Sequence, residues 1–291
     1  MSSRVLPWVL RVVWAAMPFT VGPLLGEALR HHTDAVSVAA SVGLWGAWAV
    51  VLVATLVPHP IGLTVLRCVA PGAAAVALVG VIVGGPSSLS ATVGVAWSVA
   101  VAVLTLQPAT AVLFVNGPAY PNERRLPLAA PSALLLGPLE LAWAAVVGLP
   151  AVAVVLMASS QWVVGAVVAV AGAAAVWFLG RALHGLTLRW VVFVPAGLVL
   201  HDPMGLVDPV LFVREVVESV GPAPADSTAL DLTQGAAGLT VELRLKTVVP
   251  LHLVTRGNHE GTAVEADRVL FTPSRPGAML DEAARRRLPV G

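Results

Sequence analysis

The chain has 291 residues, of which 57% are hydrophobic and only 11% charged, and its mean hydropathy is +0.87. These values exclude an ordinary soluble globular protein and indicate a membrane protein with several spans. A net charge of +1 without a basic stripe argues against nucleic acid as a partner, and the single cysteine, Cys68, excludes a disulfide framework and a cysteine-based metal site.

The charged residues divide the chain into two parts. Residues 1–180 contain six Lys/Arg and four Asp/Glu, whereas residues 181–291 contain eleven of the 17 basic and twelve of the 16 acidic residues. A bilayer core about 30 Å thick needs about 20 apolar residues per helix and disfavours charge. We therefore expect a six-span α-helical transmembrane domain over residues 1–185 and a β-rich domain over residues 187–288. The expected spans are 8–29, 36–57, 61–83, 89–115, 131–157 and 161–180.

The distribution of arginines predicts the orientation of these spans. Arg11, the region of Arg67, the pair Arg124-Arg125 and Arg181 fall on one side, and Arg30 falls on the other. The positive-inside rule then places the N-terminus in the cytoplasm, and six spans place the C-terminus there too. If the proline-rich stretch 58–72 makes span 61–83 re-entrant, every later segment changes side. The Arg-, Ala- and Val-rich composition indicates a bacterial chain, and hence the inner (plasma) membrane.

Four polar residues lie within the expected spans, where an ionisable group is a functional candidate because its burial is costly. Arg11 and Arg67 are expected about two turns from the cytoplasmic face, close enough for their side chains to reach the headgroups. Gln107 precedes Pro108, and its amide could bind the carbonyl that the proline leaves free.

Glu140 is the fourth and the most informative of these residues. It is expected nine residues into the fifth span, after the breaker Gly137-Pro138. Three interpretations are open: a structural ion pair with Arg67 or Arg11, a proton- or ion-coupling carboxylate, or a span boundary that lies elsewhere.

The C-terminal part shows the period-2 alternation of half-buried strands. Strands are expected over 188–194, 197–201, 239–245, 248–254 and 267–271, followed by a helix over 278–288. Early acidic residues and the late run Arg285-Arg286-Arg287 suit the dipole of that helix. The run could also touch anionic lipid, as could Arg124 and Arg125 at the membrane surface.

This order of short strands and one terminal helix resembles the pleckstrin-homology-like domains of many bacterial membrane proteins. The resemblance rests on Trp190–Asp202, on the paired strands around 239–254, and on Val269–Pro273 leading into the helix. It implies a binding or scaffold role at the cytoplasmic membrane face, with no shared catalytic residue. The strongly basic lipid-binding loop of eukaryotic relatives is absent here, which argues against phosphoinositide recognition.

No nucleophile elbow, phosphate-binding loop or metal-binding helix motif appears, so we expect no enzyme activity, catalytic residue, metal or cofactor. The expected function is an integral membrane scaffold or regulatory protein that presents its cytoplasmic domain to a protein partner. Small residues such as Gly165, Gly172 and Gly180 would also allow a homo-oligomer. The alternative is a secondary transporter or ion-coupled permease that uses Glu140.

Overall fold

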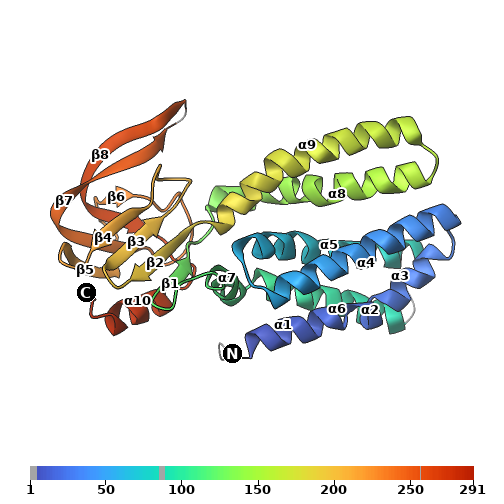
Figure 1. Ribbon diagram of the computed structural model, residues 1–291, viewed down its shortest axis with the longest axis horizontal. Helices are drawn as coiled ribbons and strands as arrows, with labels where there is room; N and C mark the ends of the chain where they lie inside the picture. Colours follow the sequence, from blue (N-terminus) through green and yellow to red (C-terminus); the bar gives the residue numbers. More distant parts are fainter. Residues whose placement is uncertain (1–4, 85–88, 256) are drawn as a thin grey trace. The chain divides into compact units, whose positions relative to one another are not determined.

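The computed structural model describes residues 5–84, 89–255 and 257–291, and the chain divides into two compact units (Figure 1). A helical unit contains Met1–Gly117 and Glu140–His184, and a β unit contains Pro118–Leu139 and Gly185–Gly291. Each unit is therefore built from two separate stretches of sequence. This division differs from the expected boundary near residue 186, because residues 118–139 belong with the β unit.

The helical unit contains five helices, within the described residues, that are long and apolar enough to cross a membrane. They are α4 (Asp34–Leu56), α5 (Pro60–Gly84), α6 (Leu89–Leu106), α8 (Pro138–Ala158) and α9 (Trp162–Thr187). The expected first span, 8–29, is instead divided into α1 (Leu6–Ala15), α2 (Met17–Thr20) and α3 (Gly22–Leu29). The expected fourth span ends early at Leu106 and is followed by the short helix α7 (Pro108–Val115).

Prolines explain where these helices are divided. Pro18, Pro23 and Pro108 each stand in the first turn of a new helix, where a missing N–H costs nothing. The end of α1 leaves carbonyls free, and in a bilayer such groups need partners within the protein. The indole of Trp48 donates to the Trp14 carbonyl at 3.1 Å, and that of Trp97 donates to the Val13 carbonyl at 3.0 Å.

The β unit contains two four-stranded sheets and a C-terminal helix (Figure 1). The first sheet is an antiparallel meander of β1 (Arg124–Pro127), β2 (Trp190–Val194), β3 (Gly197–His201) and β4 (Val210–Val213). The second has the order β5 (Val217–Pro222), β7 (Val241–Thr255), β8 (Asn258–Phe271) and β6 (Leu230–Asp231), with β6 parallel to β8. Helix α10 (Pro276–Arg285) follows, with Met279 and Ala283 fully buried. The expected β-rich domain with a terminal helix is confirmed at this level.

The first strand of the β unit comes from the connection between α7 and α8. Arg124 pairs with Phe193 and Pro127 with Trp190, in register along the whole strand. Leu126 in this strand is 3% exposed. The α8–α9 hairpin is consequently inserted between the first and second strands of one sheet, so Arg124 and Arg125 lie in a strand and not in a free membrane-surface loop.

A buried ion pair joins three segments of the β unit. The Arg189 guanidinium, 2% exposed, binds both carboxylate oxygens of Asp202 at 2.7 Å. It also donates to the Ala129 carbonyl at 2.9 Å, and the Met204 N–H donates to Asp202 at 3.1 Å. The pair thus connects the residues that follow β1, α9 and β3. Removing one partner of such a pair would strongly destabilise the fold, because it leaves a single buried charge without compensation.

A second buried carboxylate, Glu242, lies in β7. Burial by itself raises the pKa of a carboxyl group, but here hydrogen bonds from the Ser227 hydroxyl and the Arg244 guanidinium outweigh it. The pKa of Glu242 therefore lies below its ordinary value.

Candidate functional site

A cavity of about 240 Å³ lies on one face of the first sheet. Side chains of β2 and β3 form its walls, together with two residues at the start of β1. The lining residues are Glu123, Arg125, Trp190, Val192, Val194, Val199 and His201.

The pleat of the sheet brings these residues to one face. Residues directly opposite each other on neighbouring strands share a face, and the register pairs Trp190 with His201 and Val192 with both Val199 and Arg125. The intervening residues, among them Phe193 and Leu198, point to the other face and are fully buried in the core.

An aromatic stack forms the centre of the cavity wall. The Trp190 indole lies against the His201 ring with 5.1 Å between centroids, and the Arg125 guanidinium lies 5.5 Å from the indole centroid. Glu123 accepts a hydrogen bond from Arg125 at 3.0 Å and so compensates its charge. The Nδ1 atom of His201 is 2.6 Å from the Leu188 carbonyl oxygen, which can only accept. Nδ1 therefore carries a proton and donates it to this carbonyl.

The size and chemistry of this cavity suit a single large side chain. Small-molecule and cofactor sites usually measure about 300–1,000 Å³, which is larger than this cavity. Three valines supply apolar walls, while Arg125 and His201 supply polar groups for the tip of an inserted side chain. Among the residues described, no group of three or more His, Cys, Asp or Glu could hold a metal ion.

Glu140 lies at the end of a helix and not in the middle of one. Helix α8 begins at Pro138, so Glu140 is exposed in its first turn, where the helix dipole favours a carboxylate. Residues 131–137, expected to start the span, instead contain the 3₁₀ helix Ser132–Leu136. Within the described parts of the chain, no basic side chain approaches Glu140 within 4.0 Å, so the expected pairs with Arg67 and Arg11 are not formed. The span boundary was misplaced, and the transporter alternative gains no support at this residue.

The other three polar residues of the helical unit have different environments. The Nε of Arg11 donates to the Thr55 carbonyl at 3.2 Å, in the last turn of α4. The Nε of Arg67 is buried and has no hydrogen-bond partner in the described part of the chain. Gln107 is exposed. The Leu104 carbonyl, which Pro108 cannot reach with an N–H, accepts from the Thr110 hydroxyl at 2.8 Å and from the Gln107 N–H at 3.4 Å, so Thr110 takes the role expected of the Gln107 amide.

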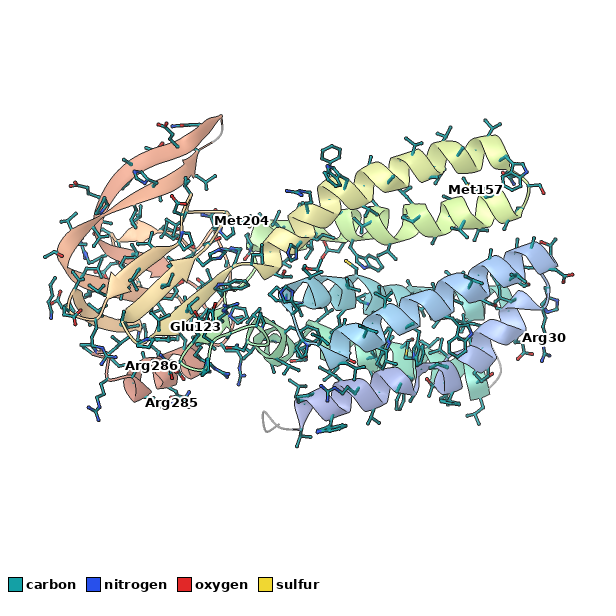
Figure 2. All side chains as sticks on the ribbon, viewed as in Figure 1. Arg30, Glu123, Met157, Met204, Arg285 and Arg286 are labelled. Atoms are coloured by element: carbon teal, nitrogen blue, oxygen red, sulfur yellow. The ribbon has the colours of Figure 1, made fainter. Side chains whose placement is uncertain are left out.

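One carboxylate compensates two of the three arginines in the run Arg285-Arg286-Arg287. Arg285 and Arg286 are labelled in Figure 2. Both bind Glu282 of α10, and Arg286 also donates to the Asn122 carbonyl at 2.9 Å. Only Arg287 of this run is exposed without an ion pair within 4.0 Å in the ranges that the structure describes.

Comparison with known proteins assigns no family: no family model, no curated protein and no solved structure matches this chain.

The cavity was not predicted from the sequence. The alternation Trp190-Val192-Val194, followed by the turn Pro195-Ala196 and by Val199 and His201, would have predicted a shared hairpin face. The contribution of Glu123 and Arg125 had no comparable signal, because Arg125 precedes its partner Val192 by 67 residues.

Proposed function

We propose that this protein is an integral membrane scaffold or regulatory protein of a bacterial plasma membrane, which presents its β unit to a protein partner in the cytoplasm. The observation that carries this proposal is the cavity on the first sheet. Its volume suits one side chain, its wall is aromatic, and pockets of this kind receive the anchor residues of protein interfaces.

The open face around the cavity supports a protein as the occupant. Leu211 and Val213 lie on the same face as Val199, because β4 pairs Leu211 with Val199 and Val213 with Gly197. They are 45% and 36% exposed. An apolar face next to a pocket with polar groups is typical of a protein-binding surface.

The pleckstrin-homology-like assignment belongs to the same proposal. Its support is the antiparallel meander β1–β4, a second sheet, and one helix at the end of the chain. A binding domain with no catalytic residue is what this resemblance implies.

The six-span count is also part of the proposal, with α1–α3 together forming the first crossing. The β1–β2 ladder supports the last two of these crossings, because strands of one sheet must lie on the same side of a membrane. Two crossings by α8 and α9 return the chain to that side. Six crossings in all then place both ends in the cytoplasm, in agreement with the arginine distribution.

Site-specific photo-cross-linking in native membranes tests this function. A photoreactive amino acid replaces Val199, which lines the cavity, or Val248, which is 55% exposed on the second sheet. We expect a protein adduct from Val199, loss of this adduct in the cavity-filling variant Val194→Trp, and no matching adduct from Val248. No adduct at Val199, or one that Val194→Trp leaves unchanged, would overturn the proposal. Removing all residues after Gly185 is a poorer test because it also leaves β1 without its sheet.

A further inference from the structure

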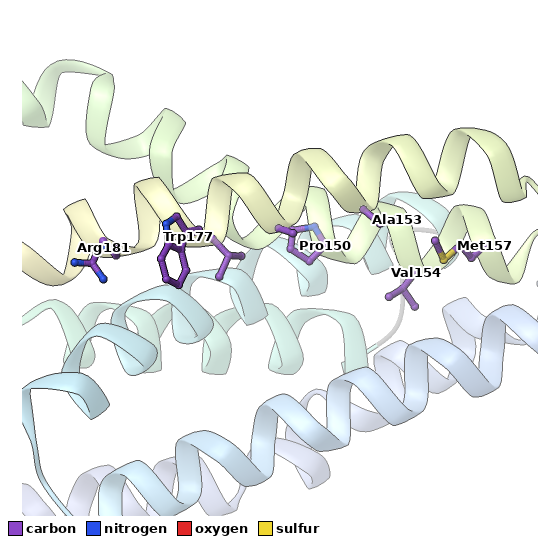
Figure 3. Close-up of a pocket in the computed structure, with 9 residues that line it drawn as sticks. Pro150, Ala153, Val154, Met157, Trp177 and Arg181 are labelled. Carbon is purple, nitrogen blue, oxygen red and sulfur yellow. The ribbon is translucent and has the colours of Figure 1, made fainter.

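A groove of about 550 Å³ lies between α8 and α9 (Figure 3). Eight of its nine lining residues are apolar, and the ninth is an arginine. They are Pro150, Ala153, Val154 and Met157 of α8, and Ala169, Ala173, Val176, Trp177 and Arg181 of α9.

The packing of the hairpin explains this groove. Gly165 and Gly172 allow the two helices to approach closely, since a Cβ there would lie 2.8 Å from the Met157 Cγ and 3.2 Å from the Pro150 nitrogen. These glycines thus serve contact within the hairpin. The small side chains of Ala153, Ala169 and Ala173 then leave a hollow along the outer edge of this contact.

Arg181 lies at one end of the groove and has no acidic partner. Its side chain is exposed, and its guanidinium lies 5.5 Å from the Trp177 ring centroid (Figure 3). Across residues 5–84, 89–255 and 257–291, no carboxylate lies within 4.0 Å of it. A tryptophan beneath a free arginine is typical of the level at which membrane headgroups begin.

The groove is longer than one leaflet of a bilayer is deep. Met157 lines the end away from Arg181 and lies against Gly165, and Gly165 and Arg181 are sixteen residues apart on α9, which corresponds to ~24 Å along the helix. Half of a hydrocarbon core ~30 Å thick is ~15 Å. An acyl chain that starts at the level of Arg181 can therefore lie along the groove through the whole depth of its leaflet.

We propose that this groove binds one acyl chain of an anionic phospholipid, with the phosphate of its headgroup on Arg181. The apolar hollow fits a hydrocarbon chain, and the uncompensated guanidinium favours a headgroup of net negative charge. A second copy of the hairpin fits less well, since it would have to bring a carboxylate to Arg181. The only acidic residue of the hairpin, Glu140, is not among the groove residues. This inference concerns the membrane part and does not rest on the partner proposed for the β unit.

Photoreactive lipids test the proposal on the purified full-length protein. The protein is placed in phosphatidylcholine vesicles with a trace of phosphatidylglycerol or phosphatidylcholine that carries a diazirine on one acyl chain. We expect adducts that map to residues 150–177, about five-fold stronger with phosphatidylglycerol, which corresponds to ~1 kcal/mol for one arginine near a membrane surface. Arg181→Gln should abolish this preference, and Arg181→Lys should keep it.

Two matched variants test the groove itself. Ala173→Phe places a ring inside the groove and should reduce adducts from both probes, whereas Ala174→Phe, one residue outside the lining, should not. Far-ultraviolet circular dichroism checks that all variants keep their helices. Equal labelling by the two probes in the unaltered protein, or full labelling of Ala173→Phe, would overturn the proposal. So would efficient disulfide cross-linking between copies through cysteines placed at Val154 and Val176, because a second copy would then occupy the groove.

Discussion

Leu126→Ala should strongly destabilise the β unit, although Leu126 lies more than 60 residues before the next strand of the same sheet. Leu126 is 3% exposed in β1, and truncation of a buried leucine costs about 2–5 kcal/mol. Because β1 is a short edge strand, which can partly readjust, we expect about 3 kcal/mol. A domain of this kind is stable by about 5–15 kcal/mol in total. The unfolded population of the β unit should therefore rise about a hundredfold.

Proteolysis in urea measures this change on the intact protein in detergent micelles. Cleavage within residues 190–271 reports the unfolded population of the β unit when opening is fast relative to cleavage. Leu136→Ala is the matched control, because Leu136 is 86% exposed on the same connection. If the two variants unfold within about 0.5 kcal/mol of each other, the range expected of surface substitutions, β1 is not part of the folded sheet and the reasoning is refuted.

Three further predictions concern single carboxylates. Asp202→Ala leaves Arg189 buried without its partner and should lower the free energy of unfolding by about 3–5 kcal/mol in the same assay. The double variant Arg189→Met with Asp202→Leu removes both charges and should recover much of this loss. Equal losses in the two variants would contradict the reasoning. The pKa of Glu242 is lower in the folded protein than in the unfolded chain, so ionised Glu242 stabilises the fold. This contribution to the free energy of unfolding is complete above the ordinary pKa of about 4.3 and disappears as the pH falls through the lower pKa of the folded state. Urea midpoints between about pH 6 and pH 3 should fall less in Glu242→Gln than in the unaltered protein, and parallel curves would refute the assignment. Glu140→Gln removes only a helix-dipole interaction, which costs about 0.3–1 kcal/mol, and should leave proton flux into vesicles unchanged; a changed flux would favour the transporter alternative.

Hydropathy predicted the long helices well because each is an uninterrupted apolar segment of sufficient length. It failed at Glu140, since the largely apolar residues 131–136 were expected to begin a span, whereas Ser132–Leu136 form a 3₁₀ helix. The backbone there turns at Gly137, whose φ of +133° suits glycine. Hydropathy measures composition and carries no information about this turn.

The strands expected over 239–245 and 248–254 form one strand, β7, whose pairing with β8 is irregular between Arg244 and Val249. Strands β2 and β3 were predictable because they are neighbours in sequence and pair with each other. Strand β1 was not, since four residues are too few for a periodic pattern and their partner lies beyond two long helices. The cavity was missed for the same reason. One wall of it requires a long-range pairing that only the folded chain displays.

The insertion of the α8–α9 hairpin has a consequence for how the protein is made. A ribosome completes β1 at Pro127 and must add 67 more residues before its partner strand β2 ends at Val194. At ~5–20 residues per second this takes about 3–13 s, during which β1 has no strand to pair with. The β unit can therefore close only after the hairpin has been synthesised. A chain whose hairpin failed to enter the bilayer would be held in an incomplete state, with an unpaired edge that quality-control proteases can recognise.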